Sequence, residues 1–329
     1  MTYDESWDRP HSPTADPNWQ ESDWLSFYDP KVRVGGICRI GQRPNRGTGQ
    51  PGLFVFALGA QRFFADDVGG RLDVDISPAD RWADGYRVGN LSVDHLGGGR
   101  VRFNFDYAEA AGSVEFYEGH YIPRSWSLTK EDIHNLFPDG HLEAGGKVRG
   151  KFCIGDETYD VACMGHRDRS WGVRTGYVER VKRIMTCWGT VGPEYSHAVL
   201  RFEPKEGEGT VQGFVMRNGV AEEVVAMRHL TTIDVDFISA IEGRVILTLE
   251  SGEEIKVRCT LAQTHAGRAP GSAFSGVGVL EVGGQRGFCT YSGLVNPSRG
   301  KHMSTQDEVT LAVVEKGLSQ TREHPVLDW

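Results

Sequence analysis

Short stretches of alternating apolar and polar residues recur along the chain, separated by glycine, asparagine or aspartate. Such alternation, rich in β-branched and aromatic residues, is typical of half-buried strands. In the first half it predicts strands at 32–40, 53–58, 91–95, 101–107 and 114–121. Further on it predicts strands at 147–154, 158–164, 185–191, 197–202, 211–216, 233–238, 245–250, 254–261, 277–282 and 285–289.

Turn and helix signals complete this pattern. The segments Leu96–Arg100 and Leu249–Glu254 each place glycine between two predicted strands, which is typical of a hairpin. The clearest helical signal is Ser127–Phe137, where Thr129 can cap and apolar residues share one face. No segment alternates strands and helices as a parallel nucleotide-binding sheet does.

The number and spacing of the strands predict an all-β fold with two domains. More than a dozen short strands are too many for one small barrel. A turn at Gly155–Asp156 provides the boundary, so we predict a flexible N-terminal arm at 1–20, a β domain at 21–155 and a second β domain at 156–329.

Composition excludes several function classes. The 329 residues carry a net charge of −9, which argues against nucleic acid as a partner. No apolar run approaches the roughly 20 residues that cross a bilayer. Residues 1–16 are polar and acidic, unlike a signal peptide. The 6 cysteines form no Cys-x-x-Cys pair, so neither zinc nor thioredoxin chemistry is predicted, and we expect reduced cysteines and a cytoplasmic protein.

The segment Gly165–Arg174 has the strongest chemical signal. It contains an imidazole, a carboxylate, three guanidiniums, a hydroxyl and an indole, with glycines at positions 165 and 172. Ligand pockets combine an apolar wall with a few convergent polar groups in this way. If the preceding strand continues, His166 and Asp168 share one face, about 7 Å apart, and Arg167 and Arg169 share the other.

Asp168 is the candidate general acid. An indole beside it, from Trp171, favours the neutral carboxyl, whereas a neighbouring Arg167 or Arg174 favours the carboxylate. A carboxylic acid held protonated in an apolar pocket can protonate an alkene or an alcohol. The alternative is structural: Asp168 pairs with Arg167, Arg169 or Arg174 and ties the two domains together, with Trp171 in the core.

Three further patterns are weaker. Gly276–Glu281 lacks the third glycine of a dinucleotide fingerprint, but an extended strand there offers Glu281 as a second carboxyl, unless it faces solvent. His141-Leu142-Glu143 is interpreted as a solvated turn before a strand. His166-x-Asp168 with a distant His229 or His265 matches the facial triad of non-haem iron oxygenases.

The segment 167–174 resembles the Arg-Asp-x-Ser-Trp-Gly-x-Arg signature of a large group of bacterial proteins, which are distantly similar to the carotenoid 1,2-hydratase and AttH-like group. Supporting marks are Glu21-Ser22 with Phe27 and Asp29, Arg39–Asn45, Val148–Gly150 and Gly276–Glu281. This chain has Arg169 where histidine is common, so histidine chemistry at that position is not expected. It has His166 where glutamine is frequent, which speaks against a shared metal role.

The resemblance implies two tandem lipocalin-like β-barrels with few short helices. It also implies hydration, dehydration, cyclisation or ring closure of bulky hydrophobic compounds, without metal or redox cofactor.

The leading hypothesis is a cofactor-independent hydratase, dehydratase, isomerase or cyclase of an isoprenoid, steroid-like or polyketide compound. Its expected catalytic residues are Asp168, His166 and Glu281, and its expected substrate-binding residues are Trp171, Arg167, Arg174 and Ser170. A carrier of apolar ligands and an iron oxygenase are the alternatives. The expected partner is a hydrophobic small molecule, and a homodimer remains open.

Overall fold

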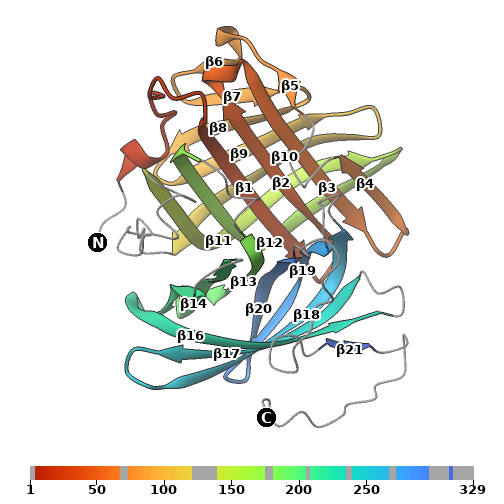
Figure 1. Ribbon diagram of the computed structural model, residues 1–329. Coiled ribbons are helices and arrows are strands. Elements are labelled where there is room, and N and C mark those ends of the chain that lie inside the picture. Colours follow the sequence, from red (N-terminus) through yellow and green to blue (C-terminus); the bar gives the residue numbers. More distant parts are fainter. Residues whose placement is uncertain are drawn as a thin grey trace, which may run out of the picture. The chain divides into compact units, whose positions relative to one another are not determined.

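The structure is a computed structural model that describes residues 4–66, 73–120, 139–174, 181–204, 208–234, 239–266, 272–295 and 311–313. Within these residues the fold is all-β, as predicted (Figure 1). The helices there are three single 3₁₀ turns: η1 (Glu5–Trp7), η2 (Pro44–Arg46) and η3 (Pro78–Asp80). The helix predicted at Ser127–Phe137 lies outside the described residues.

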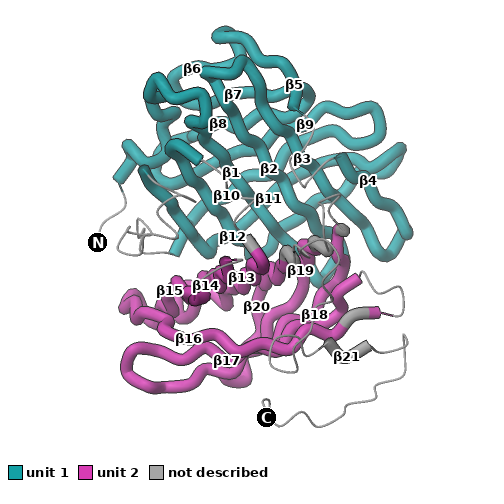
Figure 2. The backbone as a smooth tube through the Cα atoms, in the orientation of Figure 1, with its two compact units in different colours: residues 1–179 teal, residues 180–329 magenta. Residues whose placement is uncertain are grey.

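The chain forms two compact units, residues 1–179 and 180–329 (Figure 2). The boundary predicted at Gly155–Asp156 therefore falls inside unit 1. It is the two-residue turn between strands β11 (Gly140–Ile154) and β12 (Glu157–Val173), where Gly155 has a φ of 63°. A glycine in that conformation suits a tight hairpin as well as a linker, and the sequence signal did not distinguish the two.

Unit 1 is a single antiparallel sheet whose strands follow the order β4-β3-β2-β1-β12-β11-β10-β9-β8-β7-β6, with β5 paired to β3 off this path. No pairing between the two ends of this path is seen within the described residues, so here the sheet is open. The other strands are β1 (Trp19–Asp29), β2 (Val34–Arg43), β3 (Thr48–Ala57), β4 (Arg62–Asp66), β5 (Val74–Asp75), β6 (Arg81–Trp82), β7 (Gly85–Val88), β8 (Leu91–Gly97), β9 (Arg100–Asp106) and β10 (Ala110–His120).

The predicted N-terminal arm at 1–20 differs from the structure. Strand β1 begins at Trp19 and lies between β2 and β12 in the sheet. Before it, the segment 4–18 contacts the sheet: Asp8 is buried and is paired with Arg167. The polar composition of this segment suggested an arm, but its polar groups are bound by buried side chains of β12.

Unit 2 is a closed barrel of eight antiparallel strands, as the resemblance implied. The order is β15-β14-β13-β20-β19-β18-β17-β16, and pairing of β15 with β16 closes it; β21 (Leu311–Val313) adds to β16. The strands are β13 (Val181–Gly192), β14 (Tyr195–Pro204), β15 (Thr210–Arg217), β16 (Val220–Ile233), β17 (Ala240–Leu249), β18 (Glu254–Ala266), β19 (Ser272–Val282) and β20 (Gln285–Val295). Both predicted hairpin turns are confirmed, at β8–β9 and β17–β18.

Each unit has its own core, because alternate residues of each strand point to one face. In unit 1 the core side includes Leu25 and Phe27 of β1 and Val161 of β12. In unit 2 the barrel interior includes Met185, Cys187 and Tyr291. The alternation therefore assigns every residue of β12 to one of two faces, and this decides which polar side chains can meet.

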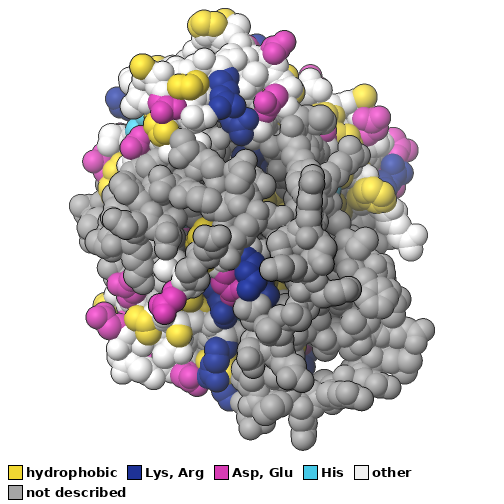
Figure 3. Space-filling view, viewed as in Figure 1, with side chains coloured by type: hydrophobic (Ala, Val, Ile, Leu, Met, Phe, Trp, Pro, Cys, Tyr) yellow, Lys and Arg dark blue, Asp and Glu magenta, His cyan; other side chains and the backbone are white. Residues whose placement is uncertain are grey.

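The visible surface carries mixed side chains. Figure 3 shows basic, acidic and apolar groups interspersed over the described part of the face in view. No helix among the described residues has the length and hydropathy that a membrane-spanning helix needs. The acidic and basic side chains that form the candidate site lie in buried clusters.

Candidate functional site

The site is organised by the pairing of β11 with β12. The two strands pair without a register shift from Ile154 opposite Glu157 to Gly140 opposite Trp171. This pairing places Glu143 directly opposite Asp168. Two ionised carboxylates facing each other across a strand pair destabilise a sheet, so a positive charge or a proton is required between them.

Two imidazoles complete what we call the His–carboxylate cluster, made of His141, Glu143, His166 and Asp168. His141 Nε2 lies 3.1 Å from Glu143 Oε1 and 3.4 Å from Asp168 Oδ1. His166 Nε2 lies 3.0 Å from Glu143 Oε2. His141, Glu143 and His166 are buried, whereas the Asp168 side chain is 18% exposed. Glu143 thus holds one imidazole with each oxygen, and Asp168 is the member that solvent can reach.

The electrostatics of the cluster shift the pKa values of its two carboxyls in opposite directions. Burial raises the pKa of Asp168 above its usual range, and the neighbouring Glu143 carboxylate adds to this. Burial also opposes ionisation of Glu143, but His141 and His166 outweigh it and lower the pKa of that carboxyl. Asp168 is therefore the carboxyl that retains a proton more readily, and Glu143 is the carboxylate.

His141 is predicted to stay protonated well above the usual range for histidine. Burial opposes its positive charge, but the Asp168 and Glu143 carboxyl groups outweigh burial and raise its pKa from 6.5 to about 9. Because the folded-state pKa is raised, the stability this group adds is complete below pH 6.5 and is lost as the pH rises through about 9. NMR titration of the histidine rings checks this, with H141Q identifying the signal; a midpoint near 6.5 would contradict it.

Three members also meet a geometric requirement for a metal ion. His141, Glu143 and Asp168 each offer a ligand atom, and these atoms all lie within 4.8 Å of one another. A metal ion would have to displace the proton that His141 holds at its raised pKa, because ligation needs the Nε2 lone pair. The ligand set expected for iron combines His166 and Asp168 with His229 or His265, which lie on β16 and β18 of unit 2.

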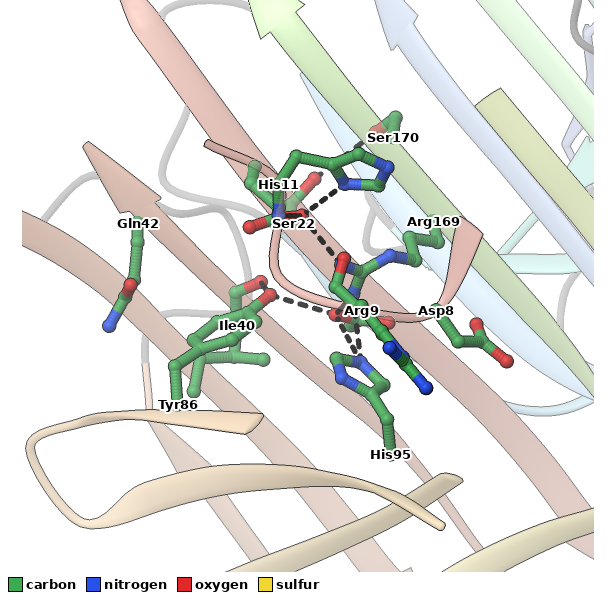
Figure 4. Close-up of polar contacts among 12 residues, drawn as sticks. Asp8, Arg9, His11, Ser22, Ile40, Gln42, Tyr86, His95, Arg169 and Ser170 are labelled. Atoms are coloured by element: carbon green, nitrogen blue, oxygen red, sulfur yellow. Dashed lines mark hydrogen bonds and ion pairs between the residues drawn. The ribbon is translucent and has the colours of Figure 1, made fainter. Parts of the chain in front are cut away.

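The opposite face of β12 carries a second group, the N-terminal ion network: Asp8, Glu21, Asp23, His95, Arg167 and Arg169. Figure 4 labels Asp8, His95 and Arg169 of this network. Arg169 pairs with Asp23 and, at 2.5 Å, with Glu21, and it donates to the Trp7 and Arg9 carbonyls. The Tyr86 hydroxyl donates to Asp23 over 2.8 Å. This network fixes segment 4–18 to the sheet.

The pKa values of the acidic members follow from this pairing. Burial opposes the ionisation of Asp23, but Arg169 and then His95 outweigh it and hold the pKa of this carboxyl well below its usual range. Glu21 shows the same balance, with Arg169 and His11 lowering its pKa against burial. The negative charges of these carboxylates are neutralised by guanidiniums, so we assign the network on this face a structural role.

Trp171 lies on the same face as the network, stacked on His11 with ring centroids 3.9 Å apart. The stack depends on Gly140, its cross-strand partner, where an added Cβ would lie 2.1 Å from the indole. We expect G140A to displace Trp171, costing about 1–3 kcal/mol of unfolding free energy through overpacking, and to change tryptophan fluorescence. G59A is the control, because nothing lies within 4 Å of a Cβ there. Equal effects of the two would contradict this role of Gly140.

The structure brings together four of the predicted site residues. His166 and Asp168 lie on one face of β12, as expected, and Ser170 follows on the same face. Ser170 Oγ accepts a hydrogen bond of 2.6 Å from Arg174 Nη2. The structural alternative, in which Asp168 pairs with an arginine, is not what the described residues form: the basic group beside the Asp168 carboxyl is the His141 imidazole, 3.4 Å away.

Three predicted residues are placed elsewhere. Arg167 is fully buried against Asp8 on the opposite face of β12. It therefore does not point toward Asp168 and is not the arginine that controls the charge of this carboxyl. Trp171 follows the same alternation and is not the wall beside Asp168. Glu281 lies on β19 of unit 2, is 40% exposed, and sits 3.7 Å from Arg258 and 3.6 Å from Arg286.

Sequence reasoning missed three residues of this face. His141 and Glu143 were assigned to a solvated turn, yet both lie buried in β11. Trp24 of β1 is the cross-strand partner of Asp168 and supplies an indole there in place of Trp171. A signal for the first two existed: if the turn at Gly155–Asp156 is interpreted as a hairpin instead of a domain boundary, counting backwards from it pairs Glu143 with Asp168.

Known structures share this fold. A putative AttH from Nitrosomonas europaea (NE1406) matches with a TM-score of 0.61 and 12% identity, covering 83% of this chain and 92% of its own. CghA solved with Sch210972 matches with a TM-score of 0.58 and 11% identity, covering 85% and 89%. Kievitone hydratase from Nectria haematococca matches with a TM-score of 0.58 and 10% identity, covering 84% of this chain and 88% of its own.

At these identities the matches establish the fold, and they confirm the resemblance to the AttH-like group at that level. A search of curated proteins by sequence gave no match. A family model described as "Domain of unknown function (DUF7064)" matches residues 4–294, which include both units' described strands up to β20. The chain therefore belongs to the DUF7064 family.

Proposed function

We propose that this protein is a small-molecule enzyme that applies acid–base chemistry to a hydrophobic compound, with the Asp168 carboxyl as proton donor. The observation that carries the proposal is the His–carboxylate cluster, in which a carboxyl with a raised pKa lies beside an imidazole and a second carboxylate. Carboxyls whose environments separate their pKa values are typical of acid–base sites.

The reaction class we propose is hydration, dehydration or cyclisation of an isoprenoid, steroid-like or polyketide compound. In a hydration, the Asp168 carboxyl gives its proton to one carbon of a double bond, and water adds to the other carbon while losing a proton to a base. In a dehydration, the same carboxyl protonates the leaving hydroxyl, and the base removes a proton from the adjacent carbon. In a cyclisation, the carbocation formed by protonation is attacked by a second double bond, and the cation that results loses a proton to the base to give a new double bond.

His166 is the base we propose for these steps. It lies two residues from Asp168 on the same face of β12, at a spacing of about 7 Å along the strand. Its Nε2 is 3.0 Å from Glu143, and this carboxylate holds the imidazole ring in place. Glu143 is thus a positioning residue for both imidazoles.

Two of the structural relatives support the substrate class. One is named a hydratase, of kievitone, and another was solved with the small molecule Sch210972. Both names refer to small organic molecules, in line with the chemistry that the cluster offers. Trp24 opposite Asp168 adds an apolar surface suited to such a compound.

Metabolite profiling tests the proposal. The purified protein is incubated with organic extracts and with a panel of terpenoid and polyketide compounds, followed by mass spectrometry. We expect one compound to gain or lose a water, or to be converted to an isomer. Capture of a compound unchanged would support the carrier alternative instead, and about one equivalent of iron in the purified protein would support the oxygenase.

A further inference from the structure

Unit 2 carries a separate polar group inside one end of its barrel, which we call the barrel-end cluster: Arg183, Arg201, Glu203, His229, Thr231 and Tyr291. Arg183 is the third residue of β13 and lies opposite Glu203, near the end of β14. The register puts Arg201 opposite Met185, a residue of the barrel core. Alternation therefore directs both arginines to the interior.

The contacts of this cluster cross the barrel. Thr231 Oγ1 and the Tyr291 hydroxyl lie 2.6 Å apart, although β16 and β20 are not neighbours in the closed sheet. Arg201 Nη2 lies 2.7 Å from Glu203 Oε1, and Arg183 Nη1 lies 3.5 Å from Glu203 Oε2. Arg201 Nη1 also donates to the Met227 carbonyl over 3.1 Å. Two guanidiniums thus converge on one carboxylate.

His229 lies beside these guanidiniums in its neutral form. Burial and the positive charges of Arg201 and Arg183 lower its pKa from 6.5 to about 3. Its Nδ1 is buried and has no hydrogen-bond partner among the described residues. A buried polar atom without a partner costs free energy, so His229 Nδ1 is a candidate hydrogen-bonding atom for a polar group in this part of the barrel.

The surroundings favour an apolar occupant with one charged end. Met185 and Met227 belong to the barrel core next to the cluster. Methionine side chains adapt their shape to different apolar groups. The planar guanidinium fork matches a carboxylate with two parallel hydrogen bonds, which makes arginine well suited to bind this group.

We propose that the barrel-end cluster binds the carboxylate of an apolar-tailed organic acid, with Arg183 and Arg201 as the principal donors. The Tyr291 and Thr231 hydroxyls and His229 supply further polar contacts around this head group. The site is in unit 2 and uses none of the residues of the His–carboxylate cluster, so it is independent of the proposed function.

Laurate is the probe for this site, and dodecanol, its uncharged counterpart, is the ligand control. Calorimetric titration of the full-length protein is expected to show saturable laurate binding that dodecanol does not reproduce. R201Q should weaken laurate binding by about tenfold to a hundredfold, the effect of losing a charge-assisted hydrogen bond. R201K, which keeps the charge but loses the fork, should fall between R201Q and the native protein.

R228Q is the matched variant control, because Arg228 lies next to His229 on β16 but pairs with the exposed Glu254. R228Q and D168N should both bind laurate as the native protein does. Thermal unfolding checks that each variant is folded, and Arg201, at 32% exposed, is the arginine of the pair whose replacement disturbs the core less. Equal binding of laurate and dodecanol, absence of binding, or equal effects of R201Q and R228Q would each overturn the proposal.

Discussion

Replacing Asp168 by asparagine is expected to abolish most catalytic turnover while leaving the fold intact. Asparagine keeps the size of the side chain but cannot donate a carboxyl proton. A positioned general acid typically contributes about 10²–10⁴-fold in rate, so turnover of the compound identified by profiling should fall by that factor in D168N. Steady-state kinetics measure this, with circular dichroism and thermal unfolding reporting the fold.

Asp160 provides the matched control. It lies on the same face of β12, eight positions before Asp168, and it is exposed. D160N should therefore turn over substrate at the native rate. A D168N protein with native turnover, or a D160N protein as impaired as D168N, would contradict the role of Asp168 as the proton donor.

The pH profile gives a second readout that a merely structural aspartate would not change. A general acid must be protonated, so turnover should fall as the pH rises through the raised pKa of Asp168. Removing the Glu143 charge takes away one of the causes of that raised pKa. E143Q should therefore move this limb of the profile to lower pH, because the Asp168 carboxyl then loses its proton more easily.

Alternation within strands was predictable from the sequence, and pairing between distant strands was not. The face shared by His166 and Asp168 follows from period two alone, and it is confirmed. That Trp24 lies opposite Asp168 depends on β1 pairing with β12, about 140 residues further along the chain. No local pattern encodes such a contact, because it follows from the topology of the whole sheet.

The errors at Trp171 and Arg167 have a different cause. Period two places both with Arg169, on the face away from Asp168, and only the expected chemistry of an indole and a guanidinium near a carboxyl suggested otherwise. The partners they have instead come from the N-terminal segment, whose polar sequence was interpreted as an arm. Amino-acid composition cannot predict ion pairs between residues that are this far apart in the sequence.

The second large effect is expected for stability. Replacing Arg169 by glutamine should lower the free energy of unfolding by about 3–5 kcal/mol, the usual cost of leaving a buried charge without its partner. Arg169 is fully buried and pairs with both Glu21 and Asp23, so its loss leaves two buried carboxylates undercompensated. Urea denaturation of the two proteins measures the difference.

R100Q is the control for R169Q, because Arg100 also pairs with a carboxylate, Glu115, but is 45% exposed. An exposed pair contributes at most about 1 kcal/mol, so R100Q should be close to native. Arg169 also binds the Trp7 and Arg9 carbonyls, so R169Q should make the N-terminal segment more susceptible to limited proteolysis. Similar stability of R169Q and R100Q would show that the network is not an ionic core.

The pH dependence separates the ionic role of Arg169 from its packing role. Glu21 and Asp23 have lowered folded-state pKa values, so their contribution to stability is complete above their ordinary values of 4.5 and 3.8 and is lost as the pH falls below them. The gap between native and R169Q proteins should therefore shrink in acid, because protonated carboxyls no longer need a guanidinium. A packing defect alone would keep the gap constant with pH, and then the ion pairs would not be what holds segment 4–18 on the sheet.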